Sequence, residues 1–276
     1  MTLPGEPAVL VDLGLSDIVD IAIAPDGSGI WLVDATGEVH TVGDALFLGS
    51  LPAIGVAPGS AVAGIASTRS GRGYWIVTKN GDVYSFGDAP HLGTLPEMGI
   101  IPAAPVVVLV ANAGGAGYWM VSEQGDVYTF GTAHYLGTLR EKGFKMVTGV
   151  AGLLPEGKEE KGYLLVDGRG EVYTFGEAWY RGSLPPAGVV PERPAIGLLR
   201  RQPSLSGGYW IVCGDGEVYS FLAPAYGSPT DRLDGEALVA SEADPLTGDG
   251  YWLLAGDGRL FGYGNVAGEL VKAISA

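Results

Sequence analysis

The stretch that decides the fold is Gly73-Tyr74-Trp75-Ile76-Val77-Thr78-Lys79-Asn80-Gly81-Asp82-Val83-Tyr84-Ser85-Phe86-Gly87-Asp88-Ala89, here called the hairpin motif. Two runs of aromatic and β-branched residues flank Asn80-Gly81, a dipeptide that strongly indicates a two-residue β-hairpin turn. Both faces of such a hairpin are largely apolar, so each needs a neighbouring sheet to cover it. A two-residue turn places four large side chains on one face: Trp75, Val77, Tyr84 and Phe86.

The hairpin motif is repeated along the whole chain. Each copy has a Trp or Leu followed eleven residues later by a Phe, Tyr or Val, and six copies are visible. The pairs are Trp31 and Val42, Trp75 and Phe86, Trp119 and Phe130, Leu164 and Phe175, Trp210 and Phe221, and Trp252 and Tyr263. The first positions are 44, 44, 45, 46 and 42 residues apart. A period of this length indicates a repeat architecture.

Each repeat also has an apolar run before the motif and a short run after it. We predict an inner strand in the first run, as at 62–65, and a fourth strand in the second, as at 91–95. Four antiparallel strands in each of six repeats predict an all-β fold, a six-bladed β-propeller forming one domain over 1–276. A linear β-solenoid and a paired sandwich fit the repeat length less well. The repeats cover approximately 17–51, 61–95, 105–139, 147–184, 194–228 and 236–270.

The two chain ends suggest how a ring would close. Thr2-Leu3-Pro4 resembles Thr94-Leu95-Pro96, so we predict that the chain begins where a fourth strand ends and that 265–270 forms the last one. Every blade would then be one contiguous segment. Closure would depend on packing between the first and last blades, helped by residues 8–11 or 271–276 along an edge.

Composition excludes several classes of protein. With 47% hydrophobic residues, 46 Gly and 18 Pro, the chain can build a core but is too rich in turn residues for a helical fold. The formal net charge of −15 opposes binding to nucleic acid or an anionic membrane. No apolar run is long enough for membrane insertion, and the N-terminus lacks the features of a signal peptide. A virion or extracellular location would therefore require a route without a signal.

The motif resembles tandem repeats found in secreted and surface-associated proteins of actinobacteria. The resemblance covers nearly the whole chain and is most specific at Gly73-Tyr74-Trp75 and at 83–87. In those proteins the repeats accompany cell-wall hydrolase or adhesion domains, so the resemblance implies a propeller with an accessory binding role. Because we see neither a catalytic domain nor a signal peptide here, the chain looks more like a bacteriophage tail or receptor-binding component.

No catalytic residue, cofactor or cofactor-binding residue is predicted. The three histidines fall in different repeats, and none has a nearby nucleophile motif. The competing class is a propeller glycosidase or lyase with its site at the central channel. That class needs carboxylates, histidines or arginines around the axis, where the inner strands show mostly Gly, Ala, Val, Leu and Ile. A purely structural subunit is the third alternative.

One pair of acidic residues is a candidate metal site. An acidic residue follows the turn glycine in five repeats, and a solvated turn explains most of these. A two-residue turn would, however, set Glu123 opposite Asp126. Like charges placed in this way destabilise a hairpin, and a bound cation such as Ca²⁺ would relieve the repulsion.

The fourth repeat carries the best candidate for a partner site. Trp179 is the only tryptophan outside the motif, and Tyr180 and Arg181 follow it. This composition is typical of an interface hot spot or a sugar-binding platform, although Trp179 could instead cover a corner of its own blade. The predicted surface also includes four nearby residues: His134, Arg140, Lys142 and Lys145. We therefore predict a non-catalytic recognition module for a protein partner in an assembly or a cell-surface glycan.

Overall fold

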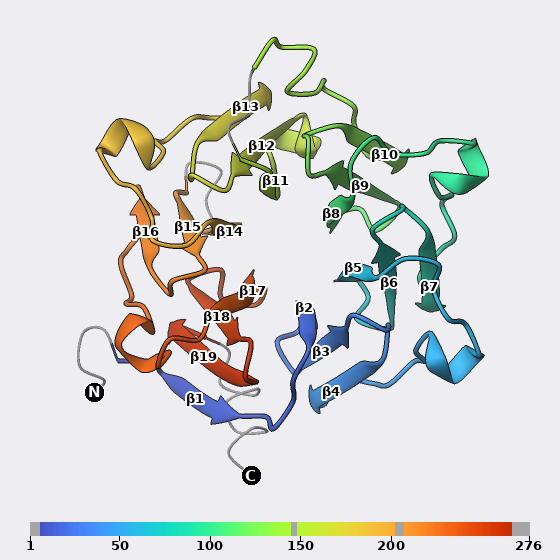
Figure 1. The fold of residues 1–276 in the computed structure, drawn as a ribbon, viewed down its shortest axis with the longest axis horizontal. Coiled ribbons are helices and arrows are strands. Elements are labelled where there is room, and N and C mark those ends of the chain that lie inside the picture. Colours follow the sequence, from blue (N-terminus) through green and yellow to red (C-terminus); the bar gives the residue numbers. More distant parts are fainter. Residues whose placement is uncertain (1–5, 145–147, 202–206, 267–276) are drawn as a thin grey trace.

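The computed structural model describes residues 6–144, 148–201 and 207–266. This part of the chain is all-β, with six small antiparallel sheets, five of three strands and one of four. Figure 1 shows the sheets arranged in a ring around a central opening. None of the helices in the described ranges is long and apolar enough to cross a membrane.

The sheets are numbered here in chain order, and each runs from an inner strand at the central opening through a middle strand to an outer strand (Figure 1). Their strands are, for sheet 1, β2 (Ile18–Ile23), β3 (Gly29–Asp34) and β4 (Val39–Gly43); for sheet 2, β5 (Val62–Ser67), β6 (Gly73–Thr78) and β7 (Val83–Gly87); for sheet 3, β8 (Val106–Ala111), β9 (Gly117–Ser122) and β10 (Val127–Gly131); for sheet 4, β11 (Val150–Glu156), β12 (Gly162–Asp167) and β13 (Val172–Gly176); for sheet 5, β14 (Ala195–Arg200), β15 (Tyr209–Cys213) and β16 (Val218–Phe221); and for sheet 6, β17 (Leu238–Ala243), β18 (Gly250–Ala255), β19 (Arg259–Gly264) and β1 (Val9–Asp12).

Short 3₁₀ turns occur outside the sheets. One lies between β11 and β12, and the others follow outer strands. They are η1 (Pro52–Ile54), η2 (Pro96–Met98), η3 (Lys158–Glu160), η4 (Pro185–Ala187) and η5 (Thr230–Arg232). Each inner strand contacts the inner strand of the next sheet, and β17 contacts β2, so the contacts run around the whole ring.

The hairpin register differs by one residue from the sequence prediction. Trp75 pairs with Ser85 rather than with Phe86, so the predicted set of side chains on one face is wrong. The loop has three residues instead of two: the Gly81 amide donates to the Thr78 carbonyl, and Gly81 has a φ of 85°. A left-handed glycine at this position completes the common three-residue hairpin loop.

The shifted register assigns the apolar side chains to two different junctions. Tyr74, Ile76 and Phe86 belong to the core between sheets 1 and 2, whereas Trp75 and Val77 belong to the core between sheets 2 and 3. All six core clusters lie between neighbouring sheets. Burying one large apolar side chain is worth about 1.5 to 3 kcal/mol, so these junctions contribute strongly to stability.

The predicted fourth strands of the first four repeats do not form. The segments 47–51, 91–95, 135–139 and 180–184, here called the outer segments, have no strand structure. Each contains a glycine with a φ between 108° and 131°. The carbonyl of that glycine accepts a hydrogen bond from a tyrosine hydroxyl of the next sheet, as Gly93 does from Tyr118. The outer segment is therefore tied to the neighbouring sheet and does not extend its own.

Strand β1 completes the ring. It pairs antiparallel with β19, from Val9 opposite Gly262 to Asp12 opposite Arg259, and the Ala8 amide donates to the Gly262 carbonyl at 2.7 Å. The start of the chain thus adds a strand to the sheet built from its end (Figure 1). The predicted contiguity of every sheet is wrong for sheet 6, whereas the predicted edge position of residues 8–11 is confirmed. Most of the predicted last strand, 265–270, and the whole tail, 271–276, lie outside the described residues.

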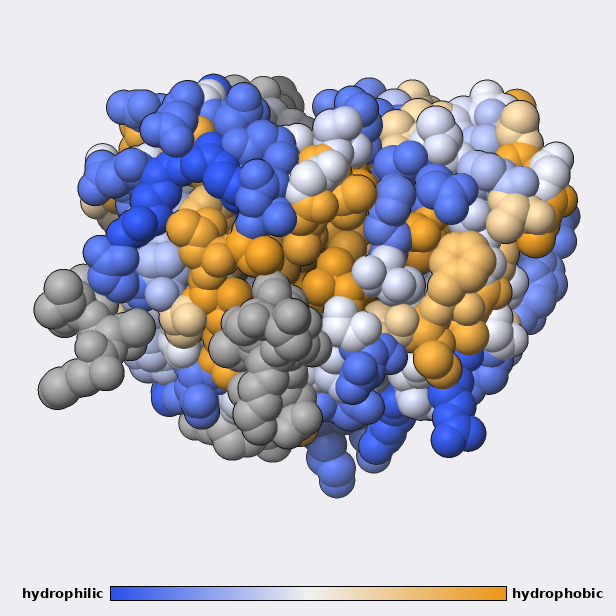
Figure 2. Space-filling view, turned by 90° about the horizontal axis from the view of Figure 1, so that it is seen from below, coloured by the Kyte–Doolittle hydropathy of each residue, from blue (hydrophilic) through white to orange (hydrophobic). Residues whose placement is uncertain are grey.

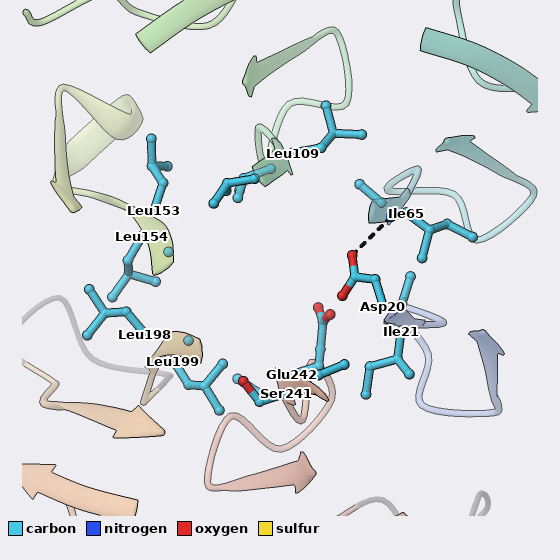
Figure 3. Close-up of a pocket in the computed structure, with 18 of the residues that line it drawn as sticks. Asp20, Ile21, Ile65, Leu109, Leu153, Leu154, Leu198, Leu199, Ser241 and Glu242 are labelled. Carbon is cyan, nitrogen blue, oxygen red and sulfur yellow. Dashed lines mark hydrogen bonds between the residues drawn. The ribbon is translucent and has the colours of Figure 1, made fainter. Parts of the chain in front are cut away.

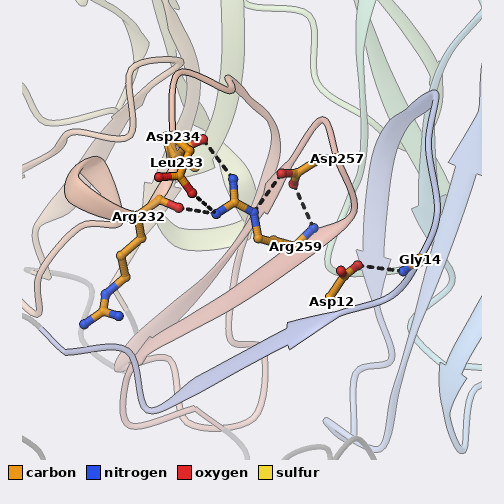
Figure 4. Close-up of polar contacts among 7 residues, drawn as sticks. All are labelled: Asp12, Gly14, Arg232, Leu233, Asp234, Asp257 and Arg259. Carbon is orange, nitrogen blue, oxygen red and sulfur yellow. Dashed lines mark hydrogen bonds and ion pairs between the residues drawn. The ribbon is translucent and has the colours of Figure 1, made fainter.

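Arg259 fixes this closing sheet to sheet 5 (Figure 4). Its guanidinium donates to the carbonyls of Arg232 and Leu233, the latter at 2.8 Å, and its Nε donates to Asp257 at 2.7 Å. It also forms an ion pair with Asp234 at 3.2 Å. Arg259 stands where five repeats have an acidic residue, and here it ties β19 to the segment that follows β16.

Candidate functional site

Sheet 4 lacks a hydrogen bond that fixes the loop after the outer strand in four other sheets. In those sheets the indole Nε1 of the motif tryptophan donates to a carbonyl 14 or 15 residues later, at 2.8 to 2.9 Å. Sheet 4 has Leu164 in place of that tryptophan, and a leucine cannot donate. The residue 15 positions later is Trp179.

Two charged residues hold the sheet 4 loop instead. Glu156, which is buried at the end of β11, accepts the Trp179 amide at 2.7 Å, and Arg181 Nη1 donates to the Trp179 carbonyl at 2.7 Å. Arg181 Nη2 lies 2.5 Å from Glu156 Oε1, an ion-pair contact without the angles of a hydrogen bond. The guanidinium also lies 5.7 Å from the centre of the Tyr209 ring. The backbone of Trp179 is thus fixed on both sides.

The indole of Trp179 itself faces solvent. Trp179 is 68% exposed, and the next residue, Tyr180, is 50% exposed. The Tyr180 hydroxyl lies 2.9 Å from the Ser183 hydroxyl. Trp179 therefore does not cover a corner of its own sheet. The Arg181 side chain, by contrast, is only 3% exposed. Arg181 positions the aromatic pair and does not itself offer a binding surface.

Other exposed apolar side chains occur around the outside of the ring. Figure 2 shows apolar surface on one side of the ring, between hydrophilic ends. Leu46, in the position that corresponds to Trp179, is 59% exposed, and Phe47 and Tyr135 are also exposed. Sheet 4 differs from these positions because a tryptophan is exposed there and its peptide groups are bonded to two charged side chains.

The remaining residues of the predicted partner surface do not all join Trp179. His134 lies in the corresponding loop of sheet 3, is exposed, and interacts electrostatically with Glu159 and Glu160 of η3. Arg140 lies at the other end of sheet 3, where it pairs with Asp126 at 3.6 Å. Lys142 is exposed in the same segment as Arg140, and Lys145 lies outside the described residues. The predicted surface is therefore divided between two ends of the molecule.

The predicted metal pair does not form. The shifted hairpin register sets Ser122 opposite Asp126, and the Asp126 amide donates to the Ser122 hydroxyl at 3.0 Å. The Glu123 side chain lies against Gly149 instead. Because no like-charge pair exists, no cation is needed to relieve it. Within residues 6–144, 148–201 and 207–266, no group of three or more His, Cys, Asp or Glu side chains could hold a metal ion.

The acidic residues after the turn glycines have a local structural role. Three of them accept hydrogen bonds from hydroxyl groups of the segment that follows the outer strand of the same sheet, at 3.0 to 3.1 Å. The pairs are Glu38 with Ser50, Glu171 with Ser183, and Glu217 with Thr230.

A second polar site lies in the central channel, and the sequence prediction missed it. The channel is a cavity of about 470 Å³ bordered by all six inner strands, and most of its lining is Ala, Val, Ile and Leu. Asp20 of β2 and Glu242 of β17 point into it, toward one another (Figure 3). Asp20 Oδ2 accepts the Ile65 amide of β5 at 3.0 Å. No hydrogen bond or ion pair joins the Glu242 carboxylate to the part of the chain that the structure describes.

The protein environment favours protons on both carboxyl groups. Burial raises the pKa of Asp20 to about 7, against the opposing effect of the Ile65 and Ile21 amides. Burial, and then the negative charge of Asp20, raises the pKa of Glu242 to about 8. Both side chains are half-buried in the channel wall.

An alignment of the six inner strands would have revealed this pair. Every inner strand has a bulge at the same place. After the bulge, Asp20 stands where the other sheets have Gly64, Val108, Gly152, Gly197 and Ala240. Two residues later, Glu242 stands where the others have Ala22, Ala66, Val110, Leu154 and Leu199. The predicted inner strands began after Asp20 and ended before Glu242, so both were left out.

No protein-family model matches the chain, and no curated protein is significantly similar to it. The geometry offers two places where a ligand could bind: the exposed aromatic pair of sheet 4 and the acidic pair in the channel. The first provides a fixed apolar surface, and the second provides two carboxyl groups inside a confined space.

Proposed function

We propose that the chain is a six-bladed β-propeller and a non-catalytic recognition module, which binds a protein partner or a surface glycan through Trp179 and Tyr180. The ring of six sheets, the contacts between successive inner strands and the strand β1 support the propeller. The resemblance to actinobacterial surface repeats extends the proposal to a partner on a cell surface or in an assembly such as a phage tail.

One observation carries the proposal: the Trp179 backbone is fixed by two charged side chains while its indole is 68% exposed. An exposed indole does not help the fold, because the apolar area it leaves in water is not buried. Fixing the loop beforehand removes part of the entropy cost of binding. Tryptophan and tyrosine combine a large apolar face with a polar edge, which suits both protein hot spots and sugar rings.

The experiment compares Trp179→Ala with a matched control, Leu46→Ala, which removes an exposed apolar side chain from the corresponding loop of sheet 1. Both variants should melt within about 1 to 2 °C of the wild type, because surface substitutions usually change stability by less than about 0.5 kcal/mol. On a glycan array and in co-purification from its native source, only Trp179→Ala should weaken partner binding, by at least about tenfold.

Two results would contradict the recognition surface. A large fall in melting temperature for Trp179→Ala would make the indole part of the fold. The second result is a partner that Trp179→Ala binds as well as the wild type does and that Leu46→Ala no longer binds. That result would place the recognition surface on sheet 1.

A propeller glycosidase or lyase with its site at the channel is the second candidate, favoured by the Asp20–Glu242 pair. Two carboxyl groups with raised pKa values could act as general acid and base. Among the described residues of the channel lining there is, however, no histidine and one arginine, Arg200, whose guanidinium donates to the Pro155 carbonyl. The recognition role is therefore better supported.

A further inference from the structure

The channel lining has a strong excess of acidic residues. Of its described charged residues, four are acidic (Asp20, Glu160, Glu242 and Asp244) and one is basic (Arg200). Asp244 accepts hydrogen bonds from Thr247 and Trp252, and Glu160 accepts the Ala113 amide at 2.9 Å. Asp20 and Glu242 direct their carboxylate groups into the open space (Figure 3).

Two polar side chains of the lining have no hydrogen-bond partner within the described residues. One is Glu242, whose carboxylate faces Asp20 (Figure 3). The other is Ser241, whose buried Oγ lies against Gly197 of β14 and not in the open channel. Of these two groups, the Glu242 carboxylate faces the open channel (Figure 3), and a ligand bound there would supply the hydrogen-bond partner that it lacks.

The arrangement of the pair is also specific to one place in the ring. Every other inner strand has Gly, Ala, Val or Leu at the two aligned positions. Gly64, on the neighbouring strand, makes room for the carboxylate, because a Cβ there would lie 2.7 Å from Asp20 Oδ2. A six-fold repeat thus carries one acidic pocket, formed where sheets 6, 1 and 2 meet.

We propose that the channel binds a small organic ammonium compound, with its charged head between Asp20 and Glu242 and its apolar body along the inner strands. An ammonium group has hydrogen-bond donors and no acceptor, so it complements two carboxylates. The apolar lining suits an alkyl or aromatic body. The volume of about 470 Å³ lies within the range of small-molecule sites. This site is separate from the Trp179 surface.

A divalent metal ion fits the pocket less well. Calcium requires six to eight oxygen ligands, and magnesium requires nearly ideal octahedral geometry. The described part of the chain has no group of three or more metal-binding side chains. An organic cation instead needs only the two carboxylates and the apolar wall.

Calorimetric titration with hexylamine tests the proposal, with hexan-1-ol as the uncharged probe and calcium chloride as the metal probe. The proteins are the wild type, Asp20→Asn, Glu242→Gln and the matched control Glu177→Gln, which removes an exposed carboxylate outside the channel. Hexylamine should bind the wild type and the control equally. Asp20→Asn and Glu242→Gln should each weaken binding at least about tenfold, and hexan-1-ol should not bind.

Loss of binding in the two channel variants would not reflect misfolding, because each replaces a half-buried carboxyl group with a neutral amide of similar shape. Their melting temperatures should equal or exceed that of the wild type. Three results would overturn the proposal: no hexylamine binding up to about 10 mM, equal binding of hexan-1-ol, or displacement of hexylamine by calcium. Trp179→Ala should leave hexylamine binding unchanged. A failure of the channel proposal is therefore distinguishable from a failure of the proposal that Trp179 and Tyr180 bind a partner.

Discussion

Breaking the contact between β1 and β19 tests how the ring closes. Val9 is 7% exposed and belongs to the core cluster between sheets 6 and 1, whereas the next residue, Leu10, is 49% exposed. Successive side chains of a strand point to opposite faces. Val9→Asp therefore places a carboxylate against the core, and Leu10→Asp places the same group in solvent, which makes the two variants a matched pair.

The expected loss follows from the burial of Val9. Burying a valine is worth about 1.5 to 3 kcal/mol, and the backbone hydrogen bonds of a four-residue strand roughly offset the entropy cost of ordering it. Because β1 is an edge strand, it can leave the sheet before it buries an aspartate. The loss is therefore limited to the free energy that holds β1, about 2 to 3 kcal/mol, and deletion of residues 1–12 should cost the same.

Urea and thermal unfolding followed by tryptophan fluorescence and circular dichroism would measure these losses. For a chain of this size, about 2 to 3 kcal/mol corresponds to a fall of roughly 4 to 12 °C in melting temperature. Leu10→Asp should change the free energy of unfolding by less than about 0.5 kcal/mol. If Val9→Asp were as stable as Leu10→Asp, or far less stable than the deletion variant, β1 would not close the ring as described.

Two further predictions concern the junctions and the channel. Tyr118→Phe removes a hydroxyl that joins sheet 3 to the outer segment of sheet 2, so the free energy of unfolding should fall by about 1 to 2 kcal/mol. The control Tyr135→Phe, at an exposed ring, should lower it by less than half as much. Equal losses in the two variants would argue that the Tyr118 hydroxyl does not stabilise the contact between the sheets. The raised pKa values of Asp20 and Glu242 mean that the folded state holds more protons than the unfolded state between about pH 4 and pH 8. Their contribution to stability is fully present below about pH 4 and is lost as the pH rises to about 8. The double variant Asp20→Asn/Glu242→Gln should therefore show a smaller decline in urea midpoint over this range, and an unchanged decline would show that other groups cause it.

The sequence was sufficient to predict the repeats, the inner and middle strands and the apolar cover on both faces of each hairpin. It could not decide the hairpin register, because Asn80-Gly81 suits both two- and three-residue loops. In the structure, the outer segment packs against this loop. A Cβ on Gly81 would lie 2.5 Å from Leu95 Cδ1, so the left-handed glycine also provides the space in which that leucine packs.

The outer segments were misread as strands for a related reason. Their Leu-Gly-Thr-Leu pattern has strand-like side chains, but its glycine carbonyl bonds a tyrosine more than twenty residues later in the chain. Local propensity does not report such a contact. The same limit hid the pairing of β1 with β19, which joins the two ends of the described chain.

The candidate sites were predicted in part. The sequence identified Trp179 because it falls outside the motif, but it gave Arg181 and Arg140 the same status as the exposed aromatic residues. Arg181 is buried and Arg140 lies at the other end of sheet 3. The channel pair was missed because the predicted inner strands began after Asp20 and ended before Glu242. The contact between β17 and β2 then brings these two residues from opposite ends of the chain near one another (Figure 3).

The most direct measurement of the recognition role is an electron cryo-microscopy reconstruction of the chain bound to the partner with which it co-purifies. The account predicts partner density against the Trp179 indole and Tyr180, with the hairpin turns at the other end of the sheets left in solvent. Partner density on those turns, with Trp179 exposed, would contradict it.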